Sequence, residues 1–300
     1  MRNVIVTGGA GFFGANLVGR MSEKGYGLTV VVRPGSEHNK RFEEYYGTGI
    51  TLIENDTGEI EKLPDKLNEI YGKTLPQYDT FYHLAWSGGR NDSEAQLKNV
   101  SDTMKALETA AGLGCKRFIC SGSQAEYGLT GDVIIDEDTD LNPVSAYGAA
   151  KIAACFMTRI RAKELCVEWI WGRIFSLIGR YEPRGRMLPD LIDSLRRGEQ
   201  ARLSSCDQYW DYLDAEDAAD AFIALGEKGV SGEIYNIANG DYHRLKHFTE
   251  TVKRRFNPEA AIVYGDAPDP YISLRPSIEK IKRDAGWSPR ISFEESLGKY

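Results

Sequence analysis

The sequence has no apolar stretch long enough to cross a bilayer, and its first residues form no signal-peptide core. We therefore expect a cytoplasmic protein with no membrane partner. It also has no run of basic residues, and its formal net charge of −7 argues against nucleic acid as a partner. The five cysteines are odd in number and include no C-x-x-C pair, so we predict reduced residues of the core.

Apolar runs alternate along the chain with segments of helical periodicity, and there are no internal repeats or low-complexity tracts. The runs predict strands at 4–7, 28–32, 50–53, 80–84, 117–120, 167–173 and 233–238. The periodic segments predict helices near 11–24, 59–71, 91–113, 144–165 and 214–228. This alternation favours an α/β fold with a parallel sheet. Asp214 is expected to cap the last helix, with the side chain of Asp217 in the first turn completing a reciprocal cap.

The segment TGGAGFFG, from Thr7 to Gly14, stands between the first predicted strand and the first predicted helix. Glycines in such a loop let the backbone turn sharply and bring its N–H groups close to a pyrophosphate. We therefore predict a dinucleotide site. Its residues would be Gly8, Gly11, Phe12, Phe13 and Gly14. The loop also satisfies the pattern G-x-G-x-x-G, so by itself it does not separate one dinucleotide-binding family from another.

The strand and helix pattern becomes irregular after Ile174 and again after Gly240, where prolines interrupt it. We expect these two stretches to form a smaller, discontinuous cap that binds the substrate. The predicted division assigns 1–173 and 205–240 to the dinucleotide-binding domain, and 174–204 and 241–300 to the cap.

Tyr147 and Lys151 lie four residues apart in PVSAYGAAK, which places them on one face of a predicted helix. An ammonium next to a phenol favours the phenolate, so such a pair can exchange a proton near neutral pH. The spacing alone also occurs on ordinary solvated helices, and its meaning depends on the glycine loop found in the same chain.

Three segments together, TGGAGFFG, FICSGSQAEYG and PVSAYGAAK, resemble the extended short-chain dehydrogenase/reductase family, which acts mostly on nucleotide sugars. The resemblance covers nearly the whole chain and implies a Rossmann-type doubly wound parallel sheet. It implies a catalytic triad of Ser123, Tyr147 and Lys151, with Asn99 as a supporting, cofactor-binding residue. By analogy with the family, the helices at 91–113 and 144–165 would form a homodimer interface.

The end of the second predicted strand bears on the choice of cofactor. NAD-dependent relatives carry an acidic residue there for the ribose hydroxyls, whereas this chain has Val32 followed by Arg33. A guanidinium suits the 2′-phosphate of NADP, so NADP(H) is favoured while NAD(H) stays open. Asp56 is expected near the adenine. Leu84 and Ala85 are expected to line the cofactor beside a structural His83, and Lys151 to bind the nicotinamide ribose.

The resemblance implies hydride exchange between nicotinamide C4 and a sugar carbon, with Tyr147 exchanging a proton with the oxygen on that carbon. Gln124 and Ala125 stand where dehydratases of the family carry Asp and Glu, and Glu126 is one place too late to replace them. We therefore favour a 4-ketoreductase of the CDP-abequose or CDP-paratose synthase type, acting on a 4-keto-6-deoxy nucleotide sugar. A nucleotide-sugar 4-epimerase is the alternative.

The predicted sugar contacts are Trp86, Ser123, Gln124, Tyr147 and Ser176, the last in place of an asparagine common in the family. Many relatives hold the substrate diphosphate with an arginine where this chain has Trp210. A second family arginine is also missing, from the stretch DAPDPYISL. The remaining candidates to hold the diphosphate are Arg180, Arg184, Arg186 and Arg275.

The sequence also permits two other interpretations. His243 and His247 have helical metal-ligand spacing, with Glu250 nearby, but no general-base glutamate follows His243, and we predict no metal. A noncatalytic NADP-binding regulator on the same fold is the alternative from another class. The complete set of Ser123, Tyr147 and Lys151 favours the enzyme.

Overall fold

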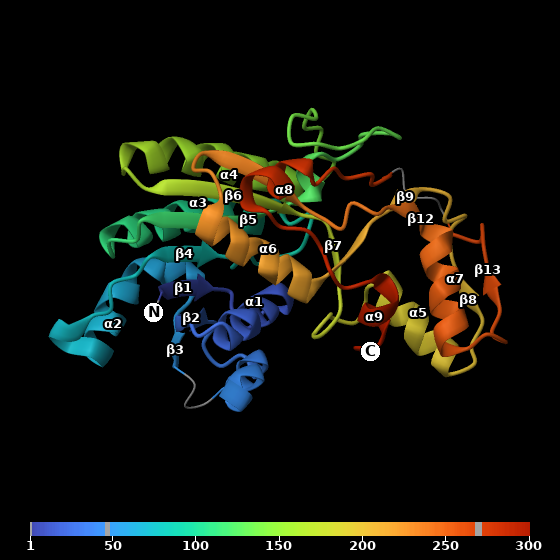
Figure 1. Cartoon of the computed structure of the whole chain (residues 1–300), viewed down its shortest axis with the longest axis horizontal. Helices are drawn as coiled ribbons and strands as arrows, with labels where there is room; N and C mark the ends of the chain where they lie inside the picture. The colour runs from blue at the N-terminus through green and yellow to red at the C-terminus, as the bar shows by residue number, and fades with distance from the viewer. Residues whose placement is uncertain (1, 46–48, 268–271) are drawn as a thin grey trace.

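The computed structural model describes residues 2–45, 49–267 and 272–300. Positions 268–271, part of the stretch in which the second family arginine is missing, lie outside these residues. Figure 1 shows a large α/β body with a smaller group of helices and short strands beside it. We call that smaller group the cap.

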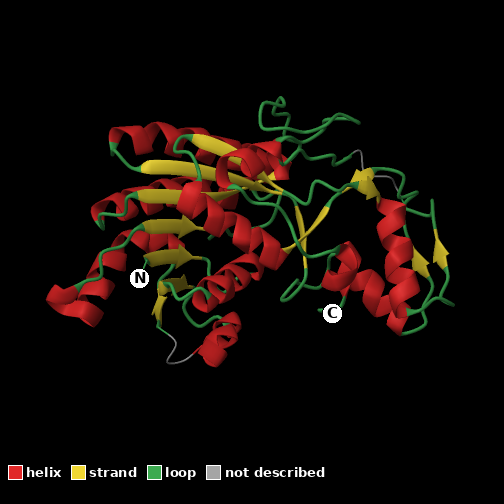
Figure 2. Cartoon of the chain, in the orientation of Figure 1, coloured by secondary structure: helices red, strands yellow, loops and turns green. Residues whose placement is uncertain are grey.

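The centre of the α/β body is a seven-stranded parallel sheet in the order β11-β6-β5-β4-β1-β2-β3 (Figure 2). Its strands are β1 (Asn3–Thr7), β2 (Gly27–Val32), β3 (Ile50–Glu54), β4 (Thr80–His83), β5 (Arg117–Ser123), β6 (Glu168–Ile174) and β11 (Glu233–Ile237). All seven predicted strands are confirmed. Their continuous apolar runs fit a sheet buried on both faces. The strand order reverses between β1 and β4, which opens a crevice at their carboxyl ends.

Helices cover both faces of the sheet. One face is covered by α3 (Ser93–Gly112) and α4 (Ala146–Glu164), which pack against each other. The other is covered by α1 (Phe12–Glu23) and α6 (Ala215–Lys228), likewise in contact. Alternate residues of a strand enter the two layers: Val4 and Val6 of β1 join the core under α1 and α6, whereas Ile5 joins the core under α3 and α4.

Shorter elements complete the α/β body. They are the 3-10 helices η1 (Glu37–Tyr45), η2 (Thr57–Lys62), η3 (Gly72–Thr74) and η4 (Gln124–Glu126), with the α-helices α2 (Leu63–Tyr71) and α8 (Glu279–Ala285). The predicted helix at 59–71 is therefore a 3-10 turn followed by a shorter α-helix. Helix α8 contacts α6 and β11.

The cap contains α5 (Met187–Arg196), α7 (Leu245–Phe256) and α9 (Phe293–Leu297). Three strand pairs accompany these helices: β7 (Ser176–Ile178) with β10 (Tyr212–Asp214), β9 (Tyr209–Trp210) with β12 (His243–Arg244), and β8 (Ala201–Arg202) with β13 (Ile262–Val263). Helices α5 and α7 pack around an apolar cluster of their own. The division of the chain into two domains stays a prediction. Helix α8, which the prediction assigns to the cap, packs on the α/β body. Strands β9 and β10, which it assigns to the dinucleotide-binding domain, pair with β12 and β7 outside the seven-stranded sheet.

Two expectations are corrected. Asp214 caps α6 as predicted, accepting a hydrogen bond from the Glu216 amide at 2.8 Å, but Asp217 does not complete that cap. Its carboxylate instead accepts from the amides of Arg290 and Ile291, because the chain near α9 returns to the start of α6. Four cysteines are buried, but Cys166 is exposed after α4 at a φ of 56° and is no core residue.

Within the described residues, no helix is long and apolar enough to span a membrane.

Candidate active site

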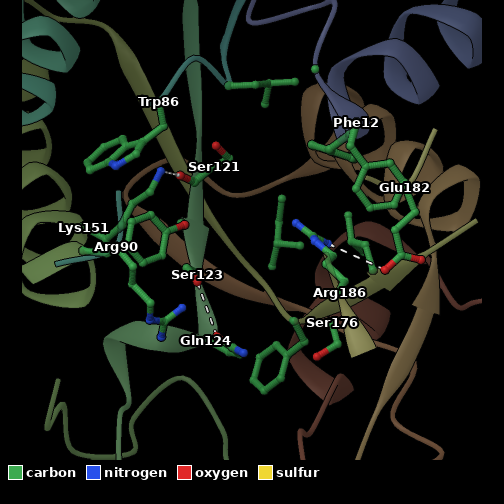
Figure 3. Close-up of a pocket in the computed structure, with 18 of the residues that line it drawn as sticks. Phe12, Trp86, Arg90, Ser121, Ser123, Gln124, Lys151, Ser176, Glu182 and Arg186 are labelled. Atoms are coloured by element: carbon green, nitrogen blue, oxygen red, sulfur yellow. Dashed lines mark hydrogen bonds and ion pairs between the residues drawn. The ribbon is translucent and has the colours of Figure 1, made fainter. Parts of the chain in front are cut away.

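A cavity of about 680 Å³ lies at the carboxyl ends of the sheet strands and reaches the cap (Figure 3). Most of the predicted site residues line it: Gly8, Gly11, Phe12, Phe13, Gly14, Leu84, Trp86, Ser123, Gln124, Tyr147, Lys151 and Ser176. The glycine loop and the predicted triad therefore open into one space. Arg33, Asp56, Ala85 and Asn99 do not line it.

The glycine loop passes very close to the chain that follows β4. Gly8 has a φ of +70°, and a Cβ at this position would lie 2.7 Å from the backbone nitrogen of Ala85. The Gly11 amide donates to the Gly8 carbonyl at 3.0 Å, which folds the loop into the start of α1. The narrow, amide-rich turn at a helix N-terminus fits a dinucleotide pyrophosphate.

Ser123 is the last residue of β5 and begins the turn η4. Its side chain is nearly buried, with 8% exposed. The hydroxyl accepts from the Ala125 amide at 3.2 Å and donates to Gln124 Oε1 at 3.4 Å. Both bonds are long, so the hydroxyl remains available to a ligand in the cavity.

Tyr147 and Lys151 lie on the first turns of α4, whose N-cap is Ser145. The helix approaches η4 closely at Gly148, where a Cβ would lie 2.4 Å from the carbonyl oxygen of Ala125. The Tyr147 amide donates to the Arg90 carbonyl at 3.0 Å. Lys151 is 2% exposed, and its ammonium donates to the Ser121 carbonyl at 2.6 Å. The α4 residues thus face the end of β5 across the cavity.

Trp86 forms a wall beside this pair. The Lys151 Nζ lies 3.6 Å from the centroid of the Trp86 ring, and the Tyr147 ring meets that of Trp86 edge-on at 6.0 Å. The indole N–H donates to Gln96 Oε1 at 2.7 Å, which fixes the plane of the ring from α3.

Asn99 is buried in α3 and forms hydrogen bonds with the loop at residues 84–92. Its amide nitrogen donates to the Ser87 carbonyl at 2.7 Å, and its oxygen accepts from the Ser87 amide at 3.1 Å. The structure therefore places this residue behind the cavity wall, where it holds the loop that carries Trp86 and Arg90.

His83 is buried at the end of β4. Its two ring nitrogens are hydrogen-bonded to the hydroxyls of Thr7 at 2.9 Å and Thr103 at 3.3 Å. Burial, and secondarily the charge of Lys151, lower the pKa of His83 to about 3. The ring is thus neutral and fully engaged, which fits the structural role expected of it.

The predicted adenosine-binding residues lie on the loops that follow β2 and β3. Arg33 is exposed directly after β2, and the Asp56 carboxylate caps η2 by accepting from the Gly58 amide at 2.8 Å. Arg41 of η1 was not singled out from the sequence. Its guanidinium donates to the Ala10 carbonyl in the glycine loop at 2.7 Å and lies 4.7 Å from the Tyr181 ring centroid.

Of the four arginines considered for the diphosphate, only Arg186 lines the cavity. Arg180 stacks on Tyr181, and Arg275 donates to the Asp132 carbonyl at 2.7 Å. Arg184 lies 3.6 Å from Asp193.

Three further residues that line the cavity could not be identified from the sequence: Glu182, Tyr212 and Arg90. Arg186 lies 3.9 Å from Glu182, whose pKa is raised, chiefly by burial. Tyr212 lines the same region as Trp210, and Arg90 lies beside Tyr147, with its guanidinium 5.5 Å from the ring centroid. Their chain positions carry no local motif, so only the folded chain brings them to the site.

His243 and His247 lie next to each other, with ring centroids 4.5 Å apart, and His243 Nε2 is 3.3 Å from Asp241. Among the described residues, no group of three or more His, Cys, Asp or Glu side chains is arranged to hold a metal ion.

A doubly wound sheet with a glycine loop and a Ser, Tyr and Lys cluster in one cavity defines an enzyme of the extended short-chain dehydrogenase/reductase class. Residues 4–238 match the model of the NAD dependent epimerase/dehydratase family, and the chain belongs to that family.

The chain is 26% identical to UDP-glucuronic acid decarboxylase 1 of Xenopus tropicalis, over 99% of this chain and 71% of the relative. It is 25% identical to UDP-glucose 4-epimerase 3 of Oryza sativa subsp. japonica, over 98% and 87%. The structure of UDP-glucose 4-epimerase from Thermotoga maritima with UDP-glucose superposes with a TM-score of 0.83 at 25% identity, covering 98% of this chain and 96% of that one.

Proposed function

We propose that the protein transfers a hydride between a nicotinamide dinucleotide and a carbon of a nucleotide-linked sugar. The observation that carries this proposal is the single cavity lined both by the glycine loop and by Ser123, Tyr147 and Lys151. A dinucleotide bound along the loop would supply the hydride, and the chain's own residues would hold the sugar and move the proton.

Tyr147 exchanges a proton with the oxygen on the reacting carbon, and the Ser123 hydroxyl donates a hydrogen bond to the same oxygen. Lys151 brings a positive charge to the phenol side of the cavity and would donate to the ribose of a bound dinucleotide. Trp86 keeps the ammonium of Lys151 in place through the contact at 3.6 Å.

Among sugar reactions, NADPH-dependent reduction of a 4-keto-6-deoxy nucleotide sugar is the favoured one. Dehydration is disfavoured because Gln124 and Ala125 provide neither acid nor base, and the Glu126 carboxylate accepts from Arg173 in the interior. The absence of an acid at Val32 and the exposed Arg33 support NADPH. A second candidate is NAD-dependent 4-epimerisation, supported by the likeness to two UDP-glucose 4-epimerases.

Arg186 is assigned to the substrate diphosphate, because it is the one arginine of the four candidates that lines the cavity. Trp210 and Tyr212 line the same region and offer aromatic faces. The substrate would then lie with its nucleotide toward the cap and its sugar toward Tyr147.

Exposed apolar side chains on α3 and α4 support a homodimer formed through these helices. Leu97 is 71% exposed and Ile160 62% exposed, and Phe156 and Met157 are 46% and 48% exposed. Apolar side chains gathered on two adjacent helices are typical of an interaction surface. Sedimentation of the protein and of Leu97→Glu tests it: the variant should be a monomer if the surface is the interface.

The proposed reaction is tested by incubating the protein with 4-keto nucleotide sugars and NADPH or NADH, and with UDP-hexoses and NAD⁺ or NADP⁺. A reductase oxidises NADPH in step with loss of one 4-keto sugar, and Tyr147→Phe serves as the matched control. An epimerase interconverts two sugars with no net change in the cofactor. A noncatalytic regulator binds the dinucleotide and leaves it and every sugar unchanged, an outcome that contradicts the proposal.

A further inference from the structure

The carboxylate of Glu126 is fully buried directly beneath the active-site serine. One oxygen, Oε1, accepts from the Ser123 amide at 2.9 Å and from the Trp171 indole at 2.9 Å. The other, Oε2, accepts from Arg173 Nε at 2.8 Å. Together with the Ser123 hydroxyl, which accepts from the Ala125 amide, this forms a reciprocal cap around the turn η4.

Arg173 is itself 2% exposed and anchors the carboxylate to the rest of the α/β body. Its Nη1 donates to the Tyr127 hydroxyl at 2.9 Å and to the Glu137 carbonyl at 3.3 Å. The Tyr127 hydroxyl donates in turn to Asn236 Oδ1 at 2.7 Å. The turn that carries Ser123 is therefore tied through one ion pair to β6 and β11.

A buried ion pair of this kind contributes little net stability compared with an apolar pair of the same volume, because both charges lose their hydration. The pair instead fixes geometry: Trp171 and Arg173 donate to the carboxylate and hold its orientation, and the carboxylate in turn holds the Ser123 amide. The Ser123 hydroxyl makes only two long hydrogen bonds of its own, so its direction depends on the backbone that Glu126 holds.

We propose that Glu126 is a positioning residue that aims the Ser123 hydroxyl at the reacting oxygen, with Arg173 as its anchor. The inference rests on the proposed function of Ser123 and holds for reduction and epimerisation alike. It gives a role to a buried carboxylate that does not line the cavity.

Glutamine has nearly the same shape but cannot replace this carboxylate. A glutamine amide has one acceptor oxygen, which can face either Arg173 or the Ser123 and Trp171 donors. In both orientations its NH₂ group, itself a donor, faces an N–H donor on the opposite side. Glu126→Gln should therefore keep the volume of the core and lose the fixed direction of Ser123.

The experiment compares Glu126→Gln with Ser123→Ala and with the double variant, using steady-state kinetics on the substrate found in the panel and dinucleotide titration. We expect Glu126→Gln to lower kcat roughly 10- to 100-fold, the scale of a misplaced catalytic group, with sugar KM and dinucleotide Kd within about twofold. In the Ser123→Ala background the same change should cost less than about threefold, because no hydroxyl is left to misdirect.

Trp171→Phe is the matched control, since it removes one donor from the same oxygen and should leave kcat within about threefold. If Glu126→Gln does not fold, Glu126→Met with Arg173→Met removes both charges at once and should fold with the same loss of kcat.

Equal losses from Glu126→Gln with and without the Ser123 hydroxyl would overturn the inference, as would a change confined to KM or to thermal unfolding. If the proposed function itself is wrong, the result is different: Ser123→Ala and Tyr147→Phe would each leave turnover unchanged.

Discussion

The ammonium of Lys151 lies over the ring of Trp86, 3.6 Å from its centroid, while it donates a hydrogen bond to the Ser121 carbonyl. A buried cation needs partners that compensate for its lost hydration, and an indole face and a carbonyl oxygen both provide negative potential. The position of Lys151 is thus set by a loop residue and a strand residue, in addition to its own helix.

Replacing Trp86 tests this arrangement. A cation–π contact at a desolvated site is worth up to about 2 kcal/mol, so Trp86→Leu should weaken dinucleotide binding and turnover by roughly 10-fold. Trp86→Phe should cost less than about threefold. Fluorescence titration and steady-state rates measure both, and Trp287→Leu, a buried change outside the cavity, should lower stability without altering dinucleotide Kd.

Substitutions of the two α4 residues, Tyr147 and Lys151, should have different effects on turnover and dinucleotide binding. Tyr147→Phe removes only the proton donor, and we expect turnover to fall at least ~10²-fold with the fold and dinucleotide binding kept. Lys151→Met should both slow turnover and weaken dinucleotide binding, because its ammonium is assigned to the ribose as well. Near-normal turnover by Tyr147→Phe would mean that the proton comes from another group.

The effects of Arg33 and Arg41 on dinucleotide binding should also be distinguishable. Arg33→Asp should shift the preference toward NADH by roughly 10- to 100-fold, since a charged hydrogen bond to the 2′-phosphate is lost and an acceptor for the ribose hydroxyls is gained. Arg41→Ala should weaken NADPH and NADH alike, because Arg41 donates to the glycine loop itself. Titration of each variant with both dinucleotides decides it, and tighter NADH binding by the unmodified protein would contradict the assignment of Arg33.

Gly8 and Gly25 have nearly the same positive φ, but a Cβ would meet backbone atoms only at Gly8. Gly25→Ala at a φ of +74° meets no atom within 4 Å and should cost about 1 kcal/mol of unfolding free energy. Gly8→Ala adds a contact of 2.7 Å with the Ala85 nitrogen and should abolish dinucleotide binding. Urea unfolding and dinucleotide titration of the two variants make the comparison. Retained binding by Gly8→Ala would exclude this loop as the pyrophosphate site.

His83 should make stability depend on pH. Its pKa is lowered to about 3 in the folded protein, so between pH 6.5 and 3 the unfolded chain binds a proton that the native state does not. Stability therefore falls as the pH drops through this window, by roughly 1 kcal/mol at pH 5.5. His83→Gln should lose less stability than the unmodified protein between pH 7.5 and 5.5 in urea unfolding. Parallel curves for the two proteins would show that His83 is not the group responsible.

The sheet could be predicted from the sequence because each strand is a continuous apolar run, but strand ends could not. The prediction ended β5 at Cys120, whereas pairing with β6 extends the strand through Ser123. The extension is polar in sequence and is ordered by tertiary hydrogen bonds, which no local pattern reveals.

The candidate site likewise contains residues that the sequence predicts and contacts that only the folded chain creates. Gly8, Ser123, Tyr147 and Lys151 belong to contiguous motifs, and the structure brings them to one cavity. Arg41 reaches the glycine loop across 31 positions of sequence, and Asp217 binds amides 73 and 74 residues away. Partners at such separations depend on how the chain folds back, so neither contact could be predicted from residue type or spacing.

The loop at residues 84–92 has no helix or strand of its own, yet it provides Trp86 and Arg90 to the cavity and is fastened through Asn99 to α3. Its two shorter hydrogen bonds to Asn99 use the Ser87 backbone, so they do not depend on which side chain stands at position 90. The residue at position 90 can therefore be exchanged to suit a different sugar while Trp86 keeps its contact with Lys151 and Ser123 and Tyr147 remain in place. At this position of the loop, substrate range can change separately from reaction chemistry.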